Sequence, residues 1–116
     1  IAFGHHMDDI VETILLNQFY RGEIAAMKPK QELFGGKITI IRPLAYVREE
    51  AMARLAQELG IAGMGQSKCA NDDTSHRMLI KKMLCQFEQD NPAVVPNIFN
   101  SLRNIKSEYL LETVKD

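Results

Sequence analysis

The fold of this 116-residue chain is decided by the stretch Gly4-His5-His6-Met7-Asp8-Asp9-Ile10-Val11-Glu12-Thr13. It follows Ile1-Ala2-Phe3, a short apolar segment typical of a strand, and it opens a run with helical periodicity. A strand that turns directly into a helix is the unit of an α/β fold, and ligands bind at the carboxyl edge of such a sheet. Two imidazoles and three carboxylates therefore gather where an α/β protein holds its ligand.

The spacing of the carboxylates favours chemistry over simple helix capping. Glu12 lies four residues after Asp8 and three after Asp9, so one helix face carries all three. The alternative is a capped helix beside a hydrogen-bonded histidine pair, in which either aspartate caps the free N–H groups. Capping accounts for one aspartate and for neither histidine. A zinc site is disfavoured, because the stretch lacks the HExxH pattern that places two histidines on one helix face.

The ordered motifs of the chain resemble a known family. Gly-His-His-x-Asp-Asp-x-x-Glu-Thr is similar to the second signature of the PP-loop ATP-pyrophosphatases, which adenylate RNA bases or small molecules. Further matches resemble the tRNA 2-thiocytidine biosynthesis proteins within that superfamily, over a region from Ile1 to about Asn104. They are Phe19-Tyr20-Arg21-Gly22, Met27-Lys28-Pro29-Lys30, Ile41-Arg42-Pro43-Leu44-Ala45-Tyr46, Cys69, Arg77 and Lys81-Lys82-Met83-Leu84.

The resemblance implies an α/β fold, the C-terminal part of a Rossmann-like (adenine nucleotide alpha hydrolase-like) PP-loop domain with a helical extension. Residues 1–65 would end the α/β core with a hairpin insertion, and residues 66–116 would form a cysteine loop and the extension. The family's phosphate-binding loop, Ser-Gly-Gly-x-Asp-Ser, is expected upstream and does not occur here. We therefore interpret the chain as a fragment that would be inactive alone.

Local patterns predict the secondary structure. A helix is expected from about residue 9 to Arg21, where Gly22 can end it. A hairpin is expected from strands 31–34 and 37–42 with Gly35-Gly36 as a two-residue turn. Amphipathic periodicity predicts further helices at 48–59, 75–89 and 96–105.

Composition limits the class of protein. Fourteen basic and fifteen acidic residues give a net charge of −1, so charge alone does not indicate a nucleic-acid-binding protein. No apolar run approaches the roughly 20 residues that cross a bilayer, and no signal peptide is recognisable. The expected location is the cytoplasm, without membrane association.

The resemblance implies specific roles for the signature residues. His6, Asp9 and Glu12 would lie near the nucleotide and its magnesium ion. Asp8 would cap and orient the helix start or share the metal role, and Arg42 would contact phosphate or RNA. Mg-ATP would adenylate the C2 oxygen of a cytidine, pyrophosphate would leave, and a sulfur species would displace AMP.

Cys69 is the candidate metal ligand. Lys68 beside it and a helix N-terminus shortly after it favour the thiolate, although these features also suit an ordinary loop cysteine. The resemblance implies the third ligand of a [4Fe–4S] cluster whose other ligands come from an upstream Cys-x-x-Cys that this chain lacks. Gln66 stands where many family members carry a further cysteine. Cys85 is predicted to be a small packed residue of a helix, with no disulfide expected.

The expected partners follow from the same resemblance. tRNA backbone could bind to basic groups at Arg21, Lys28 and Lys30 or at Arg77, Lys81 and Lys82, although each group also suits a solvated surface. A sulfur donor protein is implied, and exposed Met64, Leu110 and Leu111 would suit a homodimer interface. Two alternatives remain: a lysidine-synthase-like tRNA-adenylating enzyme without a cluster, and a non-catalytic nucleotide- or RNA-binding module.

Overall fold

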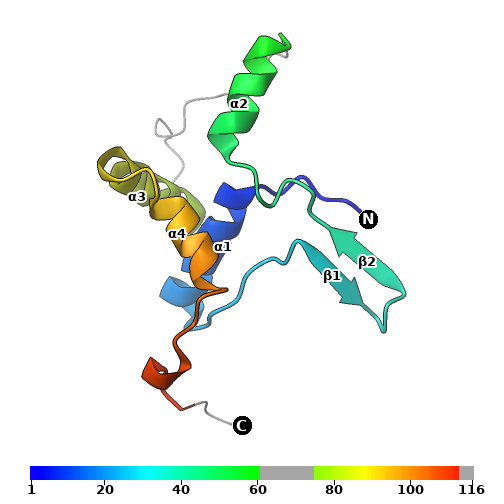
Figure 1. The fold of residues 1–116 in the computed structure, drawn as a ribbon, viewed down its shortest axis with the longest axis vertical. Coiled ribbons are helices and arrows are strands. Elements are labelled where there is room, and N and C mark those ends of the chain that lie inside the picture. The colour runs from blue at the N-terminus through cyan, green and yellow to red at the C-terminus, as the bar shows by residue number, and fades with distance from the viewer. Residues whose placement is uncertain (61–74, 113–116) are drawn as a thin grey trace.

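The computed structural model describes residues 1–60 and 75–112. Helix α1 (Met7–Arg21) packs against α3 (His76–Asp90) and α4 (Val94–Ser101), while the hairpin and α2 (Glu49–Glu58) project from this group in different directions (Figure 1). A 3-10 turn, Ser107–Tyr109, follows α4. The described residues thus form a mixed helical structure with a small sheet, compatible with part of an α/β protein.

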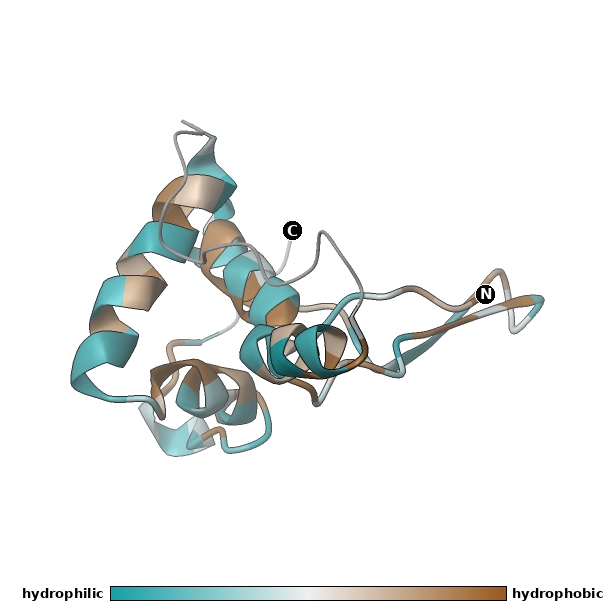
Figure 2. Ribbon diagram, turned by 90° about the horizontal axis from the view of Figure 1, so that it is seen from above, coloured by the Kyte–Doolittle hydropathy of each residue, from teal (hydrophilic) through white to brown (hydrophobic). Residues whose placement is uncertain are grey.

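The core lies between α1, α3 and α4. Apolar positions of α1 recur at helical spacing, so Ile10, Val11 and Ile14 share one buried surface. Figure 2 shows brown hydrophobic and teal hydrophilic segments alternating along the helices. Burial of this surface holds the N-terminal end of α1 in a fixed place. The core residues are Met7, Ile10, Val11, Ile14, Leu15, Ala45, Ile80, Leu84, Val95 and Phe99.

The prediction of α1 is confirmed at both ends to within two residues. The helix starts at Met7 and ends at Arg21. Gly22 follows with a φ of 65°, a left-handed conformation that glycine adopts without steric cost. Its N–H donates to the carbonyl of Asn17.

The predicted hairpin is confirmed, but its predicted turn is wrong. Strands β1 (Lys30–Leu33) and β2 (Ile38–Ile41) pair in antiparallel fashion. Four residues, 34–37, connect them instead of Gly35-Gly36 alone. Phe34 and both glycines have positive φ angles of 55°, 68° and 88°, so three successive left-handed residues make a wider turn.

The segment Ile1–Phe3 contributes less than the predicted strand. Ala2 forms a single parallel bridge with Ile41. The N–H of Phe3 donates to the carbonyl of Ile41 over 2.9 Å, and the N–H of Ile41 donates to the carbonyl of Ile1 over 2.8 Å. This bridge continues the edge of β2 and places the following histidines at the start of α1.

The other helices agree with the sequence prediction, with one shift. α2 and α3 lie within two residues of the predicted ranges, and the hydroxyl of Ser75 caps α3 by accepting from the N–H of Met78. α4 begins at Val94, two residues before its predicted start, because proline is tolerated in the first turn of a helix, and it ends at Ser101, four residues before its predicted end. None of the described helices is long and apolar enough to span a membrane.

Candidate functional site

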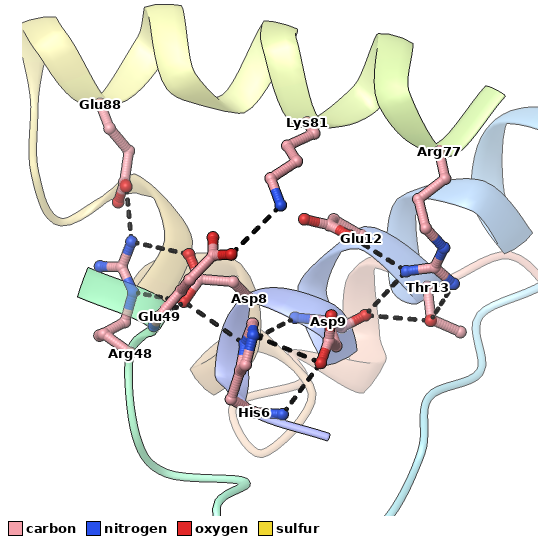
Figure 3. Close-up of polar contacts among 10 residues, drawn as sticks. All are labelled: His6, Asp8, Asp9, Glu12, Thr13, Arg48, Glu49, Arg77, Lys81 and Glu88. Atoms are coloured by element: carbon pink, nitrogen blue, oxygen red, sulfur yellow. Dashed lines mark hydrogen bonds and ion pairs between the residues drawn. The ribbon is translucent and has the colours of Figure 1, made fainter. Parts of the chain in front are cut away.

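The signature stretch forms the first turn of α1, and a histidine caps it. His6 Nδ1 accepts from the N–H of Asp9 over 3.4 Å, and an Asp9 oxygen accepts from the N–H of His6 over 3.2 Å (Figure 3). The two residues thus form a reciprocal capping box. The prediction that an aspartate side chain caps the free end of α1 is wrong in this respect, because the helix starts at Met7 and His6 takes the cap position.

Asp8 caps a different helix. Its carboxylate accepts from the N–H of Glu49 in the first turn of α2 over 2.8 Å. The same carboxylate accepts two hydrogen bonds of 3.1 Å each from Arg48, one from Nε and one from Nη2. Burial alone would raise the pKa of Asp8, but the Arg48 and Glu49 hydrogen bonds and the Arg48 charge hold it below its ordinary value. Asp8 is therefore an ionised link between α1 and α2.

Arg48 joins this link to α3 and α4. Its Nη2 donates to Glu88 of α3 over 2.6 Å, and the second Glu88 oxygen accepts from the N–H of Val95 in α4 over 3.1 Å. Figure 3 shows Arg48 between the two carboxylates. Burial by itself would lower the pKa of Arg48, yet its bonds to Asp8 and Glu88 raise the pKa above its ordinary value. One guanidinium thus neutralises two carboxylates that each cap a helix.

Glu12 is buried, with 3% of its surface exposed. Arg77 of α3 donates to its carboxylate over 3.1 Å and to the hydroxyl of Thr13 over 3.0 Å. Burial raises the pKa of Glu12 above its ordinary value, although the charges of Lys81 and Arg77 act in the opposite direction. Glu12 therefore points into the protein and contacts α3.

The raised pKa of Glu12 predicts a pH-dependent stability. Because its folded-state pKa exceeds the ordinary value of 4.5, the native protein holds this proton more tightly than the unfolded chain does. The resulting stabilisation is complete below about pH 4.5 and is lost as the pH rises through the folded-state pKa. Urea unfolding at several pH values should show wild type losing stability relative to Glu12→Gln towards neutral pH. A difference that does not change with pH would contradict this assignment.

An acidic cavity of about 270 Å³ lies where α1, α2 and α3 meet. Five carboxylates and two cations line it, and Lys81 Nζ contacts Glu49 over 3.3 Å on one side. Since the carboxylates outnumber the cations, the cavity attracts cations and repels bare phosphate. The charged lining residues are Asp8, Glu12, Arg48, Glu49, Glu50, Lys81 and Glu88.

Asp9 is the signature carboxylate with the most exposed side chain. It is 31% exposed, against 14% for Asp8 and 5% for Glu12, and a ring nitrogen of His6 lies 3.5 Å from its carboxylate. Residues 1–60 and 75–112 contain no group of three or more His, Cys, Asp or Glu side chains placed to hold a metal by themselves. Mg²⁺ commonly uses only one or two protein carboxylates together with phosphate oxygens and water, so Asp9 fits that use.

Arg42 lies within the protein, with 8% of its surface exposed. Its Nη1 donates to the carbonyl of Lys28 over 2.8 Å, and its Nε donates to His5 Nδ1 over 3.4 Å. The guanidinium thus holds the start of the signature stretch against the segment that leads into β1. This placement favours a positioning role, and the predicted contact with phosphate or RNA remains a prediction.

The two cysteines differ in what the structure shows. Cys69 lies outside the described residues, so its assignment as a metal ligand remains a prediction. Cys85 lines the acidic cavity and is disulfide-bonded. The prediction of a simply packed Cys85 without a disulfide is therefore wrong.

One of the two predicted basic patches is engaged within the protein. Arg77 contacts Glu12, and Lys81 contacts Glu49, so two of the three cations in the group on α3 are paired. Lys28 and Lys30 are exposed beside β1. The group at Lys28 and Lys30 is therefore the more accessible of the two.

Sequence reasoning missed Arg48 and Glu88. Arg48 lies forty positions after Asp8 and forty positions before Glu88. Local spacing in the sequence therefore does not predict these contacts. The available signal was the position of Arg48 immediately before a helix with two glutamates in its first turn. That signal predicts a helix start and not an ion pair.

Curated relatives match almost the whole chain. It is 38% identical over 112 residues to the tRNA-cytidine(32) 2-sulfurtransferase of Polynucleobacter asymbioticus, 39% over 113 residues to that of Nitrosospira multiformis, and 40% over 114 residues to that of Geobacter sulfurreducens. Each match covers 97% of this chain. The predicted resemblance to the tRNA 2-thiocytidine proteins is thereby confirmed.

The chain spans 37%, 38% and 44% of the lengths of these three relatives, respectively. The likeness thus concerns less than half of each relative. No protein-family model matches the chain.

Proposed function

We propose that this chain is part of an enzyme that replaces the 2-oxygen of a tRNA cytidine by sulfur, on a Rossmann-like PP-loop domain. The observation that carries the proposal is the likeness over 97% of the chain to proteins named for this reaction. The signature geometry supports it, because a strand-like segment leads into a capped helix start that carries an accessible carboxylate. This is where a nucleotide binds in an open α/β fold.

Mg-ATP is the proposed nucleotide, and it would supply an activated phosphate ester on the cytidine. The acidic cavity suits a nucleotide that arrives with its magnesium, since the cation offsets repulsion between carboxylates and phosphates. Asp9 does not line this cavity, but it follows Asp8, which does, and it would hold the ion together with phosphate oxygens. His6 would fix the orientation of Asp9 through the capping box, while Asp8 and Glu12 would position the helix through Arg48 and Arg77.

Thiolation of tRNA by the full-length protein tests this proposal. The protein would be incubated without oxygen with Mg-ATP, a sulfide source, lysine and a tRNA transcript that carries cytidine at position 32. Nucleoside mass spectrometry should find 2-thiocytidine, formed only with ATP and accompanied by AMP. A transcript with uridine at that position is the control. Incorporation of lysine in place of sulfur would favour the cluster-free alternative, and an unmodified tRNA would contradict both enzymes.

A [4Fe–4S] cluster is a separate proposal that involves Cys69. Cys69, as a reduced thiolate, would be one ligand, and cysteines outside this chain would supply the others.

Iron analysis tests this ligand assignment. The full-length protein, purified and reconstituted without oxygen, should contain about four irons per chain and absorb visible light. Cys69→Ser should lose most of the iron, whereas Cys85→Ser should keep it. A wild-type protein without iron would remove the cluster from the proposal and return Cys69 to an ordinary loop residue.

A further inference from the structure

A second cavity, of about 520 Å³, lies on the other side of α1. Ile10 lines this cavity, whereas Asp8 and Glu12 line the acidic one. With 3.6 residues in each turn, Ile10 projects from the helix nearly opposite to these two carboxylates. The mechanism proposed above uses none of the residues of this second cavity.

The cavity has an apolar floor and an aromatic wall. Ile10 and Phe99 are buried in it, and Met27 is half-buried. Tyr46 meets the ring of Phe99 edge to face, with centroids 5.5 Å apart, yet 57% of Tyr46 remains exposed. The tyrosine ring is thus held in one orientation while it stays accessible.

The charges of this cavity are opposite to those of the acidic cavity. Lys28 and Arg103 line it, and no aspartate or glutamate does. The guanidinium of Arg103 lies 5.7 Å from the centre of the Tyr46 ring and 5.8 Å from that of Phe99, within the range of cation–π attraction. Arg103 donates to the side-chain oxygen of Asn100, and within residues 1–60 and 75–112 neither Lys28 nor Arg103 forms an ion pair, so no carboxylate neutralises either charge.

We propose that this second cavity binds an unpaired nucleotide of the substrate RNA, with its base against Tyr46 and its phosphate near Lys28 and Arg103. This inference rests on the proposed function, which requires a tRNA. Proteins bind single strands with aromatic rings that stack on bases and with cations that follow the backbone, and this cavity combines both. Its volume lies in the range of small-molecule sites and suits a nucleotide.

The position of the cavity indicates which nucleotide it would take. α1 separates it from the acidic cavity, and a helix with its side chains is about 10 Å thick. A base on Tyr46 is therefore a neighbour of the reacting cytidine and not the cytidine itself. The cavity would hold the RNA strand in register while the target base reaches the other side of α1.

Binding of a fluorescent tRNA transcript to the full-length protein tests the proposal. Tyr46→Ala should weaken binding about tenfold to a hundredfold, the usual effect of losing one base–aromatic stack. Tyr46→Phe keeps the ring and should bind more tightly than Tyr46→Ala. Arg103→Ala should reduce the slope of log affinity against log salt by about one. Arg54→Ala, which removes an exposed cation of α2 outside both cavities, is the matched control.

Photocrosslinking provides a test that does not depend on any variant folding. A transcript containing 4-thiouridine in its unpaired regions should crosslink to wild-type peptides that contain Tyr46 or Arg103. If wild type thiolates tRNA but the crosslinks lie elsewhere and Tyr46→Ala binds normally, this inference fails and the proposed function stands. If wild type neither binds nor thiolates tRNA, both fail. Loss of thermal stability in Tyr46→Ala without loss of RNA binding would identify Tyr46 as a structural residue that packs on Phe99, which also overturns the inference.

Discussion

Asp9→Asn in the full-length protein is expected to lower the rate of ATP-dependent thiolation about a hundredfold or more, with little change in stability. Asp9 is the signature carboxylate with the most exposed side chain, so it is the one available to a magnesium ion and its phosphates. Asparagine keeps an oxygen that can accept from the N–H of His6, which preserves the capping box. The substitution therefore removes the charge and leaves the helix start in place. Losing one charge-stabilising group at a reaction centre typically costs a factor of this size.

The control for the loss of the Asp9 charge is Glu32→Gln, which makes the same acid-to-amide change at an exposed position of β1. It should thiolate tRNA at the wild-type rate. Mass spectrometry of 2-thiocytidine over time gives the rates, and urea unfolding gives the stabilities. If Asp9→Asn retained its rate, Asp9 would be a capping residue only. If it lost activity together with stability, the loss could not be assigned to the charge.

Local signals were sufficient for most helix boundaries of the fold, although not for the end of α4. The C-terminal end of α1 follows from Gly22, which adopts a left-handed conformation at that end. The start of α3 follows from Ser75, whose hydroxyl caps the helix. Such features depend on groups within a few residues of one another, so the sequence alone is enough to predict them. The turn of the hairpin was missed because Phe34 takes a positive φ, which its residue type does not indicate.

The contacts of the site were not predictable in the same way. Arg42 precedes a proline at the end of a strand, which suggested a guanidinium free for phosphate. In the fold its partners are a carbonyl and a histidine from two other segments, and these come together only after the chain folds. Glu12 was expected at the nucleotide, yet Arg77, sixty-five positions away, holds its carboxylate. Sequence spacing shows which residues share one face of a helix. The segments that pack against that face determine which of these residues stay accessible.

Arg48→Ala is expected to lower the free energy of unfolding by about 2–3 kcal/mol, because it leaves two partly buried carboxylates without their shared cation. The side chains of Arg48, Asp8 and Glu88 are 25%, 14% and 21% exposed, so solvent moderates the loss below that of a fully buried pair. Both carboxylates also cap helices, and their unbalanced charges would strain the junction of α1, α2, α3 and α4. Urea unfolding at neutral pH measures the loss.

The pH dependence of this loss distinguishes an electrostatic cause from lost packing. Arg48 helps to hold the pKa of Asp8 below its ordinary value of 3.8, so this stabilisation is complete above about pH 4 and is lost as the pH falls through the folded-state pKa. The difference between wild type and Arg48→Ala should therefore shrink in acid. Arg54→Ala on the exposed face of α2 should change stability by less than about 0.5 kcal/mol.

A triple variant measures how much of this stability comes from the charges of Asp8, Arg48 and Glu88 and how much comes from the helix caps that the two carboxylates form. Asp8→Asn, Glu88→Gln and Arg48→Met together remove all three charges, while the two amide oxygens can still accept from the N–H groups of Glu49 and Val95. Neutral replacement of a partly buried ion network is often close to neutral in stability. The triple variant should therefore recover most of what Arg48→Ala loses. If it is as unstable as Arg48→Ala, the arginine acts through its packed aliphatic stem and methionine does not replace it. If Arg48→Ala is itself as stable as wild type, the three carboxyl–guanidinium bonds do not hold the helices together, and the junction depends on the apolar core alone.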